Sequence, residues 1–194
     1  MNVALRKPMT LADFLDWEER QELRWEFDGA RPHAMTGGTV RHDRITFKLH
    51  KALDARLTGK PCQPYGSNVK IVVAGSARYP DAFVTCNQPA ENATIADDPV
   101  VVFEVISEST ARTDRIDKLR EYQATASIQR YVILEQTSIA ATVFARIGDL
   151  WTASALTEND TLAMPEIGIE LPIAECYLGL DLSPPTEAET EAQA

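Results

Sequence analysis

Apolar residues recur at every third or fourth position in two long segments of the chain, and this spacing predicts two amphipathic helices. The first helix covers residues 40–57 and the second covers residues 111–126. A shorter helix is predicted for residues 11–20, because Thr10 and Asp13 have the spacing of an N-terminal capping box. We therefore expect one short helix near the N-terminus and two longer helices after it.

Shorter runs of β-branched and aromatic residues, bounded by turn residues, predict strands. Two pairs of runs flank a favoured turn dipeptide, Asp28-Gly29 in one case and Gly148-Asp149 in the other, and each pair is predicted to form a hairpin. Further short strands are expected after the second hairpin. The main predicted strands cover residues 23–27, 31–35, 68–74, 81–86, 100–106, 130–135, 140–146 and 150–155.

The elements between residues 40 and 135 follow the order helix, strand, strand, strand, helix, strand. This order predicts an α/β (α+β) fold in which a central mixed β-sheet is flanked by helices. A chain of 194 residues is long enough for one hydrophobic core and short for two, so residues 1–182 are predicted to form a single domain. Residues 183–194 have no apolar periodicity, which predicts a disordered acidic tail.

Two carboxylates interrupt the predicted strands. Glu104 lies inside the apolar run 100–106, which is typical of a strand buried on both faces, and Asp81 opens the run 81–86. A buried, ionised carboxylate is strongly destabilising unless a cation compensates it. Two such groups on neighbouring strands also repel each other, and one bound divalent cation would relieve both effects. The pattern therefore predicts a metal site that contains Asp81 and Glu104.

The cysteine and histidine content narrows the chemistry further. The three cysteines are an odd number without a Cys-x-x-Cys pair, which argues against a disulfide framework and against a zinc knuckle. The three histidines share no ligand spacing with the cysteines, so a zinc or iron site is not expected. No segment has the roughly 18 consecutive apolar residues of a membrane span, and the N-terminus lacks a secretory signal. We expect a cytoplasmic protein that does not associate with membranes.

Charge is distributed unevenly along the chain. The net charge of −10 opposes binding to nucleic acids, whose phosphates attract basic proteins. Basic residues nevertheless cluster in the segments 41–60 and 112–120. These clusters are either solvated helix faces or contacts for a nucleic acid, and the sequence leaves both interpretations open.

Several motifs in a fixed order carry a family resemblance. They are Trp-Glu-Phe-Asp-Gly at 25–29 with Met35, His42, Pro80-Asp81, Glu-Val-Ile-Ser-Glu-Ser-Thr at 104–110, Asp114 with Lys118 and Tyr122, and Tyr131. Together they resemble the core of the PD-(D/E)XK nucleases and, over most of the chain, the Uma-type family of putative restriction endonucleases.

This resemblance implies both a fold and an activity. The implied fold is a restriction-endonuclease-like core, to which this chain adds an N-terminal hairpin and C-terminal strands. The implied activity acts on DNA with Mg²⁺ or Mn²⁺, and without an organic cofactor. The expected metal ligands are Asp81, Glu104 and the backbone carbonyl of Val105.

The sequence departs from the usual nuclease motif at one position. That motif has a lysine two residues after the second acid, on the same face of the strand, and here the position is Ile106. Lys118, on the helix that follows the Glu104 strand, is the predicted replacement, because its long side chain can reach back toward the strand. The resemblance agrees, since Uma-type sequences carry a lysine at the matching helix position. The alternative is that Lys118 forms an ordinary surface pair with Asp114.

Alternatives also remain open for the other candidate residues. Asp81 is either a strand residue of the site or a turn residue, and Glu104 is either a ligand or the partner of a structural arginine. Glu26 is either a third acid of the site or an exposed strand residue. His42 is expected to cap or pack rather than to catalyse. Tyr122, which could orient the lysine, is expected to be a half-buried core residue.

The favoured hypothesis is a metal-dependent DNA endonuclease with Asp81, Glu104 and Lys118 as its catalytic residues. The competing hypothesis is a non-catalytic DNA-binding or regulatory protein on a nuclease fold, with a vestigial metal site. Cleavage of both DNA strands requires two active sites, so we expect a homodimer. The hairpin at Asp28-Gly29 and the C-terminal strands are candidate contact surfaces.

Overall fold

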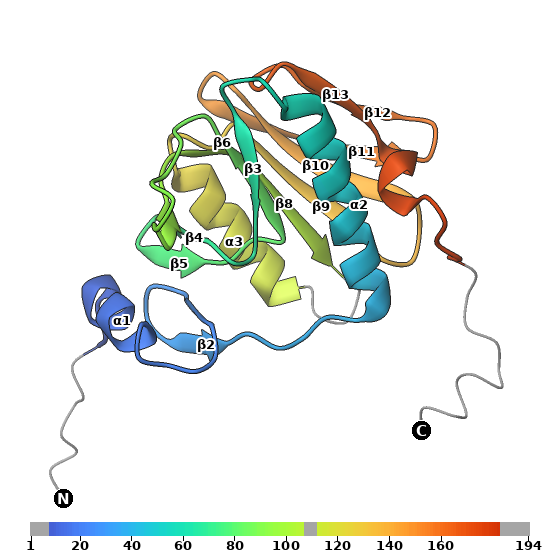
Figure 1. Cartoon of the computed structure of the whole chain (residues 1–194). Helices are drawn as coiled ribbons and strands as arrows, with labels where there is room; N and C mark the ends of the chain where they lie inside the picture. The colour runs from blue at the N-terminus through green and yellow to red at the C-terminus, as the bar shows by residue number, and fades with distance from the viewer. Residues whose placement is uncertain (1–7, 107–111, 183–194) are drawn as a thin grey trace, which may run out of the picture.

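A six-stranded mixed sheet forms the centre of the computed structural model, which describes residues 8–106 and 112–182 (Figure 1). The strand order is β11-β10-β9-β8-β6-β3. Strands β8 and β9 pair in parallel, while the other neighbours pair antiparallel. The strands are β3 (Gln63–Gly66), β6 (Ala82–Thr85), β8 (Pro99–Ile106), β9 (Arg130–Glu135), β10 (Ala140–Ile147) and β11 (Leu150–Thr157).

Strand β8 is apolar on both faces because each face contacts a different core. Val101, Phe103 and Val105 belong to the core on one face, whereas Val102 and Ile106 belong to the core on the other face. This alternation is the period of two that a strand imposes on its side chains. Glu104 has the same parity as Val102 and Ile106, so it points to the second face of the sheet.

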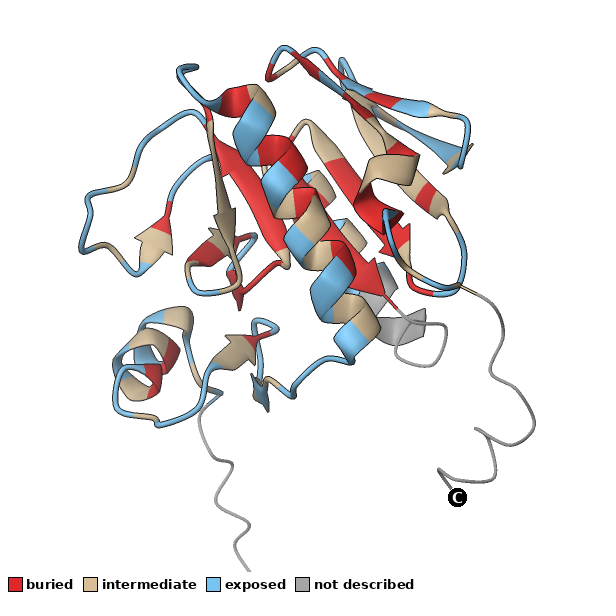
Figure 2. Cartoon of the chain, turned by 45° about the vertical axis from the view of Figure 1, so that its right-hand side comes forward, coloured by how far each residue is buried: buried red, intermediate tan, exposed pale blue. Residues whose placement is uncertain are grey.

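One long helix covers each face of the central sheet (Figure 1). Helix α2 (Val40–Leu57) contributes Ile45, Leu49 and Leu53 to the first core, and α3 (Arg112–Ala124) contributes Tyr122 to the second. Figure 2 shows buried residues along the side of α2 that faces the sheet and exposed residues on its outer side. Helix α2 therefore has the amphipathic character that its sequence predicts.

A second sheet packs beside α3 and extends the second core. Ile71, Val73 and Ala96 from this sheet contact the same apolar cluster as Tyr122. Its five strands follow the order β2-β1-β5-β4-β7. They are β1 (Trp25–Phe27), β2 (Pro32–Ala34), β4 (Lys70–Val73), β5 (Ser76–Arg78) and β7 (Ile95–Ala96).

The two ends of the described chain pack on opposite parts of the molecule. Helix α1 (Leu11–Glu18) begins with the predicted capping box of Thr10 and Asp13, and Phe14 stacks on Phe27. At the other end, β12 (Thr161–Met164), β13 (Ile169–Pro172) and the 3₁₀ helix η2 (Ile173–Tyr177) pack against α2 and the first core. No helix in these described ranges is long and apolar enough to cross a membrane.

The predicted mixed sheet with flanking helices is confirmed, but one strand was assigned to the wrong sheet. The predicted strand 68–74 corresponds to β4, which lies in the five-stranded sheet rather than in the central one. The central sheet instead uses β3, whose sequence Gln-Pro-Tyr-Gly shows no apolar alternation. Proline and glycine are tolerated there because β3 is an edge strand. The predicted tail, residues 183–194, lies outside the described residues.

The cysteines also differ from the expectation. Cys62 and Cys86 form a disulfide, which the odd cysteine count argued against, and Cys176 is a buried free thiol. The two bonded cysteines flank paired strands, since Gln63 in β3 lies opposite Thr85 in β6. Strand register brought them together, and spacing along the sequence carries no sign of that.

Candidate active site

Asp81 and Glu104 meet where strand β6 begins. Ala82 lies opposite Phe103 in the antiparallel pair of β6 and β8, so continuing this register by one residue places Asp81 opposite Glu104. Asp81 itself precedes β6, as the alternative interpretation of this residue supposed. Being at a strand boundary does not remove it from the site, because its side chain lines the same cleft as Glu104.

Two donors hold one oxygen of the Asp81 carboxylate. The backbone N–H of Val105 donates to Oδ2 at 2.7 Å, and Nε2 of His42 lies 3.1 Å from the same oxygen. The hydrogen bond with Asp81 raises the pKa of His42, although burial opposes this effect. No residue that the structure describes bonds Oδ1 of Asp81. The carboxylate is therefore fixed in orientation through one of its two oxygens.

The Glu104 carboxylate is bound in the same one-sided way. Nζ of Lys118 and the hydroxyl of Tyr122 both donate to Oε1, each at 3.0 Å. Within the described ranges, Oε2 has no hydrogen-bond partner. Burial raises the pKa of Glu104 to about 7, and the charges of Asp81 and Glu26 act in the same direction against that of Lys118. A further cation beside this carboxylate would favour its ionised form.

Helix α3 supplies Lys118 and Tyr122 from one side, because positions four residues apart share a helix face. Both side chains are buried, whereas Ile116 on the same helix is 45% exposed. The partner of Glu104 is thus a lysine and not the arginine considered from the sequence. Tyr122 is fully buried rather than half-buried. The side chain of Asp114, the alternative partner of Lys118, lies outside the described residues.

Glu26 belongs to this cluster and is not an exposed strand residue. Its Oε1 accepts the backbone N–H of Tyr79 at 3.0 Å and lies 3.7 Å from Nζ of Lys118. Its Oε2 accepts from Arg78 at 3.1 Å. Both oxygens are therefore occupied, and the charge of Glu26 acts on the two cations beside it.

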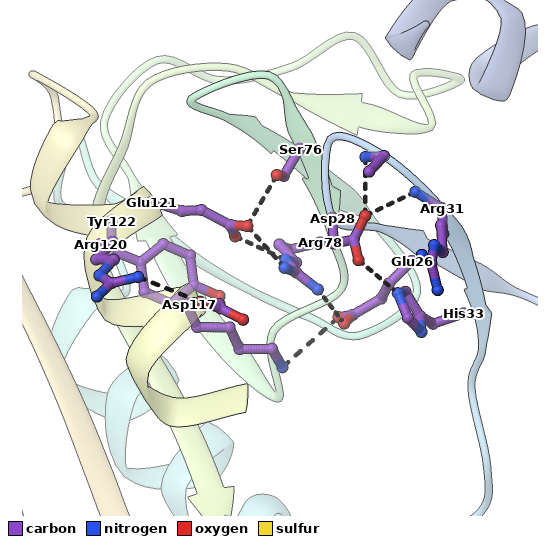
Figure 3. A network of polar contacts seen from close by, with 12 residues as sticks. Glu26, Asp28, Arg31, His33, Ser76, Arg78, Asp117, Arg120, Glu121 and Tyr122 are labelled. Atoms are coloured by element: carbon purple, nitrogen blue, oxygen red, sulfur yellow. Dashed lines mark hydrogen bonds and ion pairs between the residues drawn. The ribbon is translucent and has the colours of Figure 1, made fainter. Parts of the chain in front are cut away.

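Two further residues of the network escaped the sequence analysis. Arg78 makes a bidentate pair with Glu121, with both N–O distances at 2.7 Å, and Ser76 donates to the same glutamate (Figure 3). Arg78 thereby links Glu121 on α3 to Glu26 on β1. Helical spacing could have associated Glu121 with Lys118, since they lie three residues apart on one helix. Nothing in the sequence indicated that Arg78 is the partner of Glu121 and Glu26.

These side chains line a polar cleft with a volume of about 580 Å³. The β1–β2 hairpin forms one wall of the cleft through Asp28 and His33, and α2 adds His42. The backbone N–H of His42 donates to the N-cap Thr39, and its ring contacts Asp81, so this histidine orients an acid of the site. All sequence-predicted site residues, apart from the buried Tyr122, line this one cleft: Glu26, His42, Asp81, Glu104, Val105 and Lys118.

The donor set is limited but suits a hard cation. Within the described ranges, no group of three or more His, Cys, Asp and Glu side chains has the arrangement of a metal centre. Mg²⁺ needs only one or two carboxylates, because it retains several water ligands. The oxygens left unbonded on Asp81 and Glu104 fit that requirement, and zinc would require more protein ligands.

The chain is similar to known proteins both in sequence and in fold. Residues 11–174 match the Uma2 family, described as putative restriction endonuclease. Two uncharacterized proteins of Synechocystis sp. are similar in sequence. One, slr1290, is 30% identical over 87% of this chain and 90% of its own length, and the other, sll1609, is 27% identical over 77% and 87%. The fold resembles the crystal structure of a putative nuclease belonging to DUF820 from Anabaena variabilis, with a TM-score of 0.72 and 14% identity over 88% of this chain and 98% of that one.

Proposed function

Since the chain belongs to the Uma2 family of putative restriction endonucleases, we propose that it is a metal-dependent DNA endonuclease that hydrolyses phosphodiester bonds. The observation that carries this proposal is the pair of opposed carboxylates, Asp81 and Glu104. Each is anchored through one oxygen, and its other oxygen has no hydrogen-bond partner among the described residues. A purely structural carboxylate at the same depth would be expected to have both oxygens bonded.

The proposed metal ligands are Asp81, Glu104 and the carbonyl of Val105, with Mg²⁺ or Mn²⁺ as the ion. When bound, such an ion polarises the phosphodiester and acidifies a water molecule. The chain itself keeps the ligands in place. The N–H of Val105 and the ring of His42 prevent rotation of the Asp81 carboxylate, and Tyr122 does the same for Glu104.

Lys118 is proposed to act on the attacking water or the phosphate. Its ammonium group lies between Glu104 and Glu26, at 3.0 and 3.7 Å, and lines the cleft while being buried from bulk solvent. A positive charge held there can stabilise the negative charge that develops on the phosphate. Glu26 is proposed to position this lysine, and Arg78 to position Glu26. Lys118 is thus assigned the role of the strand lysine that Ile106 replaces.

The alternative function is a non-catalytic DNA-binding or regulatory protein. Two observations favour it, namely the absence of a lysine at position 106 and the net charge of −10. The two functions differ in what a divalent ion does. If the metal site is active, a divalent ion must stabilise the protein, because an ion that binds only the folded state raises the melting temperature. A vestigial site has no such requirement.

The direct test is nicking of supercoiled plasmid DNA with Mg²⁺, with Mn²⁺ and with EDTA. We expect metal-dependent nicking by the wild type and none by Glu104→Gln or Asp81→Asn. Glu158→Gln, which removes the charge of an exposed glutamate outside the cleft, is the matched control and should nick like the wild type. Nicking by Glu104→Gln at the wild-type rate would remove the carboxylate pair from the mechanism.

The homodimer remains part of this proposal, because one cleft per chain makes one cut. Sedimentation of the protein with and without a DNA duplex would test it. A monomer that cuts both strands in a single binding event would contradict the expectation of two cooperating chains.

A further inference from the structure

A histidine and an aspartate on the β1–β2 hairpin form a pair that the proposed mechanism does not use. Nε2 of His33 lies 2.7 Å from Oδ2 of Asp28, and Oδ1 of Asp28 accepts the backbone N–H groups of Ala30 and Arg31 at 2.8 and 2.7 Å (Figure 3). Asp28 is thereby held rigidly by its own turn. The ring of His33 is held by Asp28 in turn, although more than half of its side chain, 55%, is exposed.

Strand register places this pair on the cleft side of the hairpin. His33 lies directly opposite Glu26 in the antiparallel pairing of β1 and β2, and opposed residues of such a pair share one face. Glu26 reaches into the cleft, where it lies 3.7 Å from Nζ of Lys118. His33 and Asp28 line the same cleft as Asp81 and Glu104. The pair therefore stands at the entrance to the proposed active site.

Binding a phosphate at this cleft requires an exposed hydrogen-bond donor, because most of the charged side chains that line the cleft are acidic. The acids Glu26, Asp28, Asp81, Glu104 and Asp117 line it, and they would repel a phosphate. Its other basic side chains are already engaged. The guanidinium of Arg78 is bound to Glu26 and Glu121, Lys118 is bound to Glu104, and His42 is bound to Asp81.

We propose that His33, oriented by Asp28, binds a phosphate group of the nucleic-acid substrate at the entrance to the cleft. With Nε2 directed at Asp28, Nδ1 is the ring nitrogen that remains to meet the phosphate. In the doubly protonated imidazole both ring nitrogens donate, Nε2 to Asp28 and Nδ1 to the phosphate.

This inference rests on the proposed function, since it assumes a phosphodiester substrate, but it can be tested without cleavage. The probe is a fluorescein-labelled DNA duplex in EDTA, and the measurement is its anisotropy at pH 6.0 and pH 8.5. Wild-type binding should be tighter at pH 6.0, where histidine is protonated. His33→Gln should weaken binding about tenfold at pH 6.0 and change it little at pH 8.5, because only the charged hydrogen bond is lost.

Two further variants distinguish phosphate binding by His33 from the general attraction of DNA to positive charge. Arg31→Gln removes a permanent charge from the same hairpin, outside the cleft lining, and should weaken binding equally at both pH values. Asp28→Asn should weaken binding about threefold at pH 6.0, since it preserves the turn but not the charge that orients His33. Melting temperatures of all variants should equal that of the wild type within a few degrees, because these side chains are exposed.

The outcomes distinguish this inference from the proposed function. If the wild type nicks plasmid while His33→Gln binds DNA like the wild type at pH 6.0, the role of His33 is wrong and the endonuclease stands. If the Arg31→Gln variant shows the same pH-selective loss, the effect is not specific to His33, and the inference fails as well. If the wild type neither binds nor nicks DNA, both proposals fail.

Discussion

Two buried glutamates in this chain are each bound by one lysine and one tyrosine. Glu18 accepts from Lys70 at 2.5 Å through Oε2 and from Tyr79 at 2.8 Å through Oε1. Glu104 accepts from both of its partners through Oε1 alone. Among the described residues, the same three residue types thus bond both oxygens of one carboxylate and a single oxygen of the other.

On this difference rests our proposal of a functional site at Glu104 and a structural ion pair at Glu18. The Glu18 group joins α1 to Lys70 in β4 and to Tyr79, which follows β5. Apart from Tyr79 it lies outside the cleft lining, and no second acid among the described residues is bonded to it. The Glu104 group lies opposite Asp81, whose carboxylate is also bonded through one oxygen within the described part of the chain. Burial alone does not separate the two groups, because Glu18 and Glu104 are equally inaccessible, with 7% of each side chain exposed. What separates the two groups is Oε2 of Glu104, which has no hydrogen-bond partner among the described residues.

The largest effect is expected from breaking the structural pair. Lys70→Met leaves the charge of Glu18 buried, with Tyr79 as its one remaining donor among the described residues. This should lower the free energy of unfolding by about 3–5 kcal/mol. Urea denaturation measures this change. The fraction that remains folded should nick DNA at the wild-type rate. A variant as stable as the wild type would mean that the Glu18 group is not a structural ion pair.

The matched change in the site should affect activity more than stability. Lys118→Met is expected to slow plasmid nicking by about 10²–10³-fold in Mn²⁺, because it removes a charge that stabilises the transition state. Stability should fall less than in Lys70→Met, since Glu104 can take up a proton near neutral pH. Adding Ile106→Lys should restore part of the activity, as position 106 shares the strand face of Glu104. Full activity of Lys118→Met would mean that Lys118 only balances the charge of Glu104 and has no part in cleavage.

A divalent ion should distinguish the two glutamates directly. At 100 times its dissociation constant, Mg²⁺ or Mn²⁺ should stabilise the wild type by about 2.7 kcal/mol, visible as a rise in melting temperature. Glu18→Gln should show the same rise from a lower starting temperature. Glu104→Gln should show none. An equal rise in all three proteins would place the ion outside the proposed site.

The smallest effect concerns pH in the absence of metal. Burial raises the pKa of Glu104 from 4.5 to about 7, so the folded state binds a proton there more tightly than the unfolded state. The stability that this proton contributes is complete below pH 4.5 and is lost as the pH rises through 7. The wild type should therefore gain stability relative to Glu104→Gln when the pH falls from 8 to 5. Urea denaturation of both proteins in EDTA at these two pH values tests the direction of this change in the free energy of unfolding.

The sequence predicted most of the site because its signals are local. Glu104 is conspicuous inside an apolar strand, and the bounds of α2 follow from helical spacing that ends near Gly59. Lys118 and Tyr122 follow Glu104 within 14 and 18 residues, so one strand and one helix contain all three. Such short-range patterns are what helical and strand periodicity record.

The residues that sequence analysis missed depend on contacts between distant segments. Arg78 and Glu121 are 43 residues apart, and Lys70 and Glu18 are 52 apart. Their pairing follows from how the five-stranded sheet packs against α3 and α1, and no periodicity encodes that packing. For the same reason Glu26 could be described only as one of two alternatives before its contacts with Arg78 and Tyr79 were seen.

The placement of Ile106 and Lys118 around one carboxylate has an evolutionary consequence. Position 106 approaches Glu104 along the strand, and Lys118 approaches it from the helix, so either position can supply the same ammonium group. A lineage could acquire the helix lysine while the strand lysine was still present and lose the strand lysine later. Every intermediate along that route would retain a cation beside Glu104, and position 106 would then be free to become apolar and join the core around Tyr122.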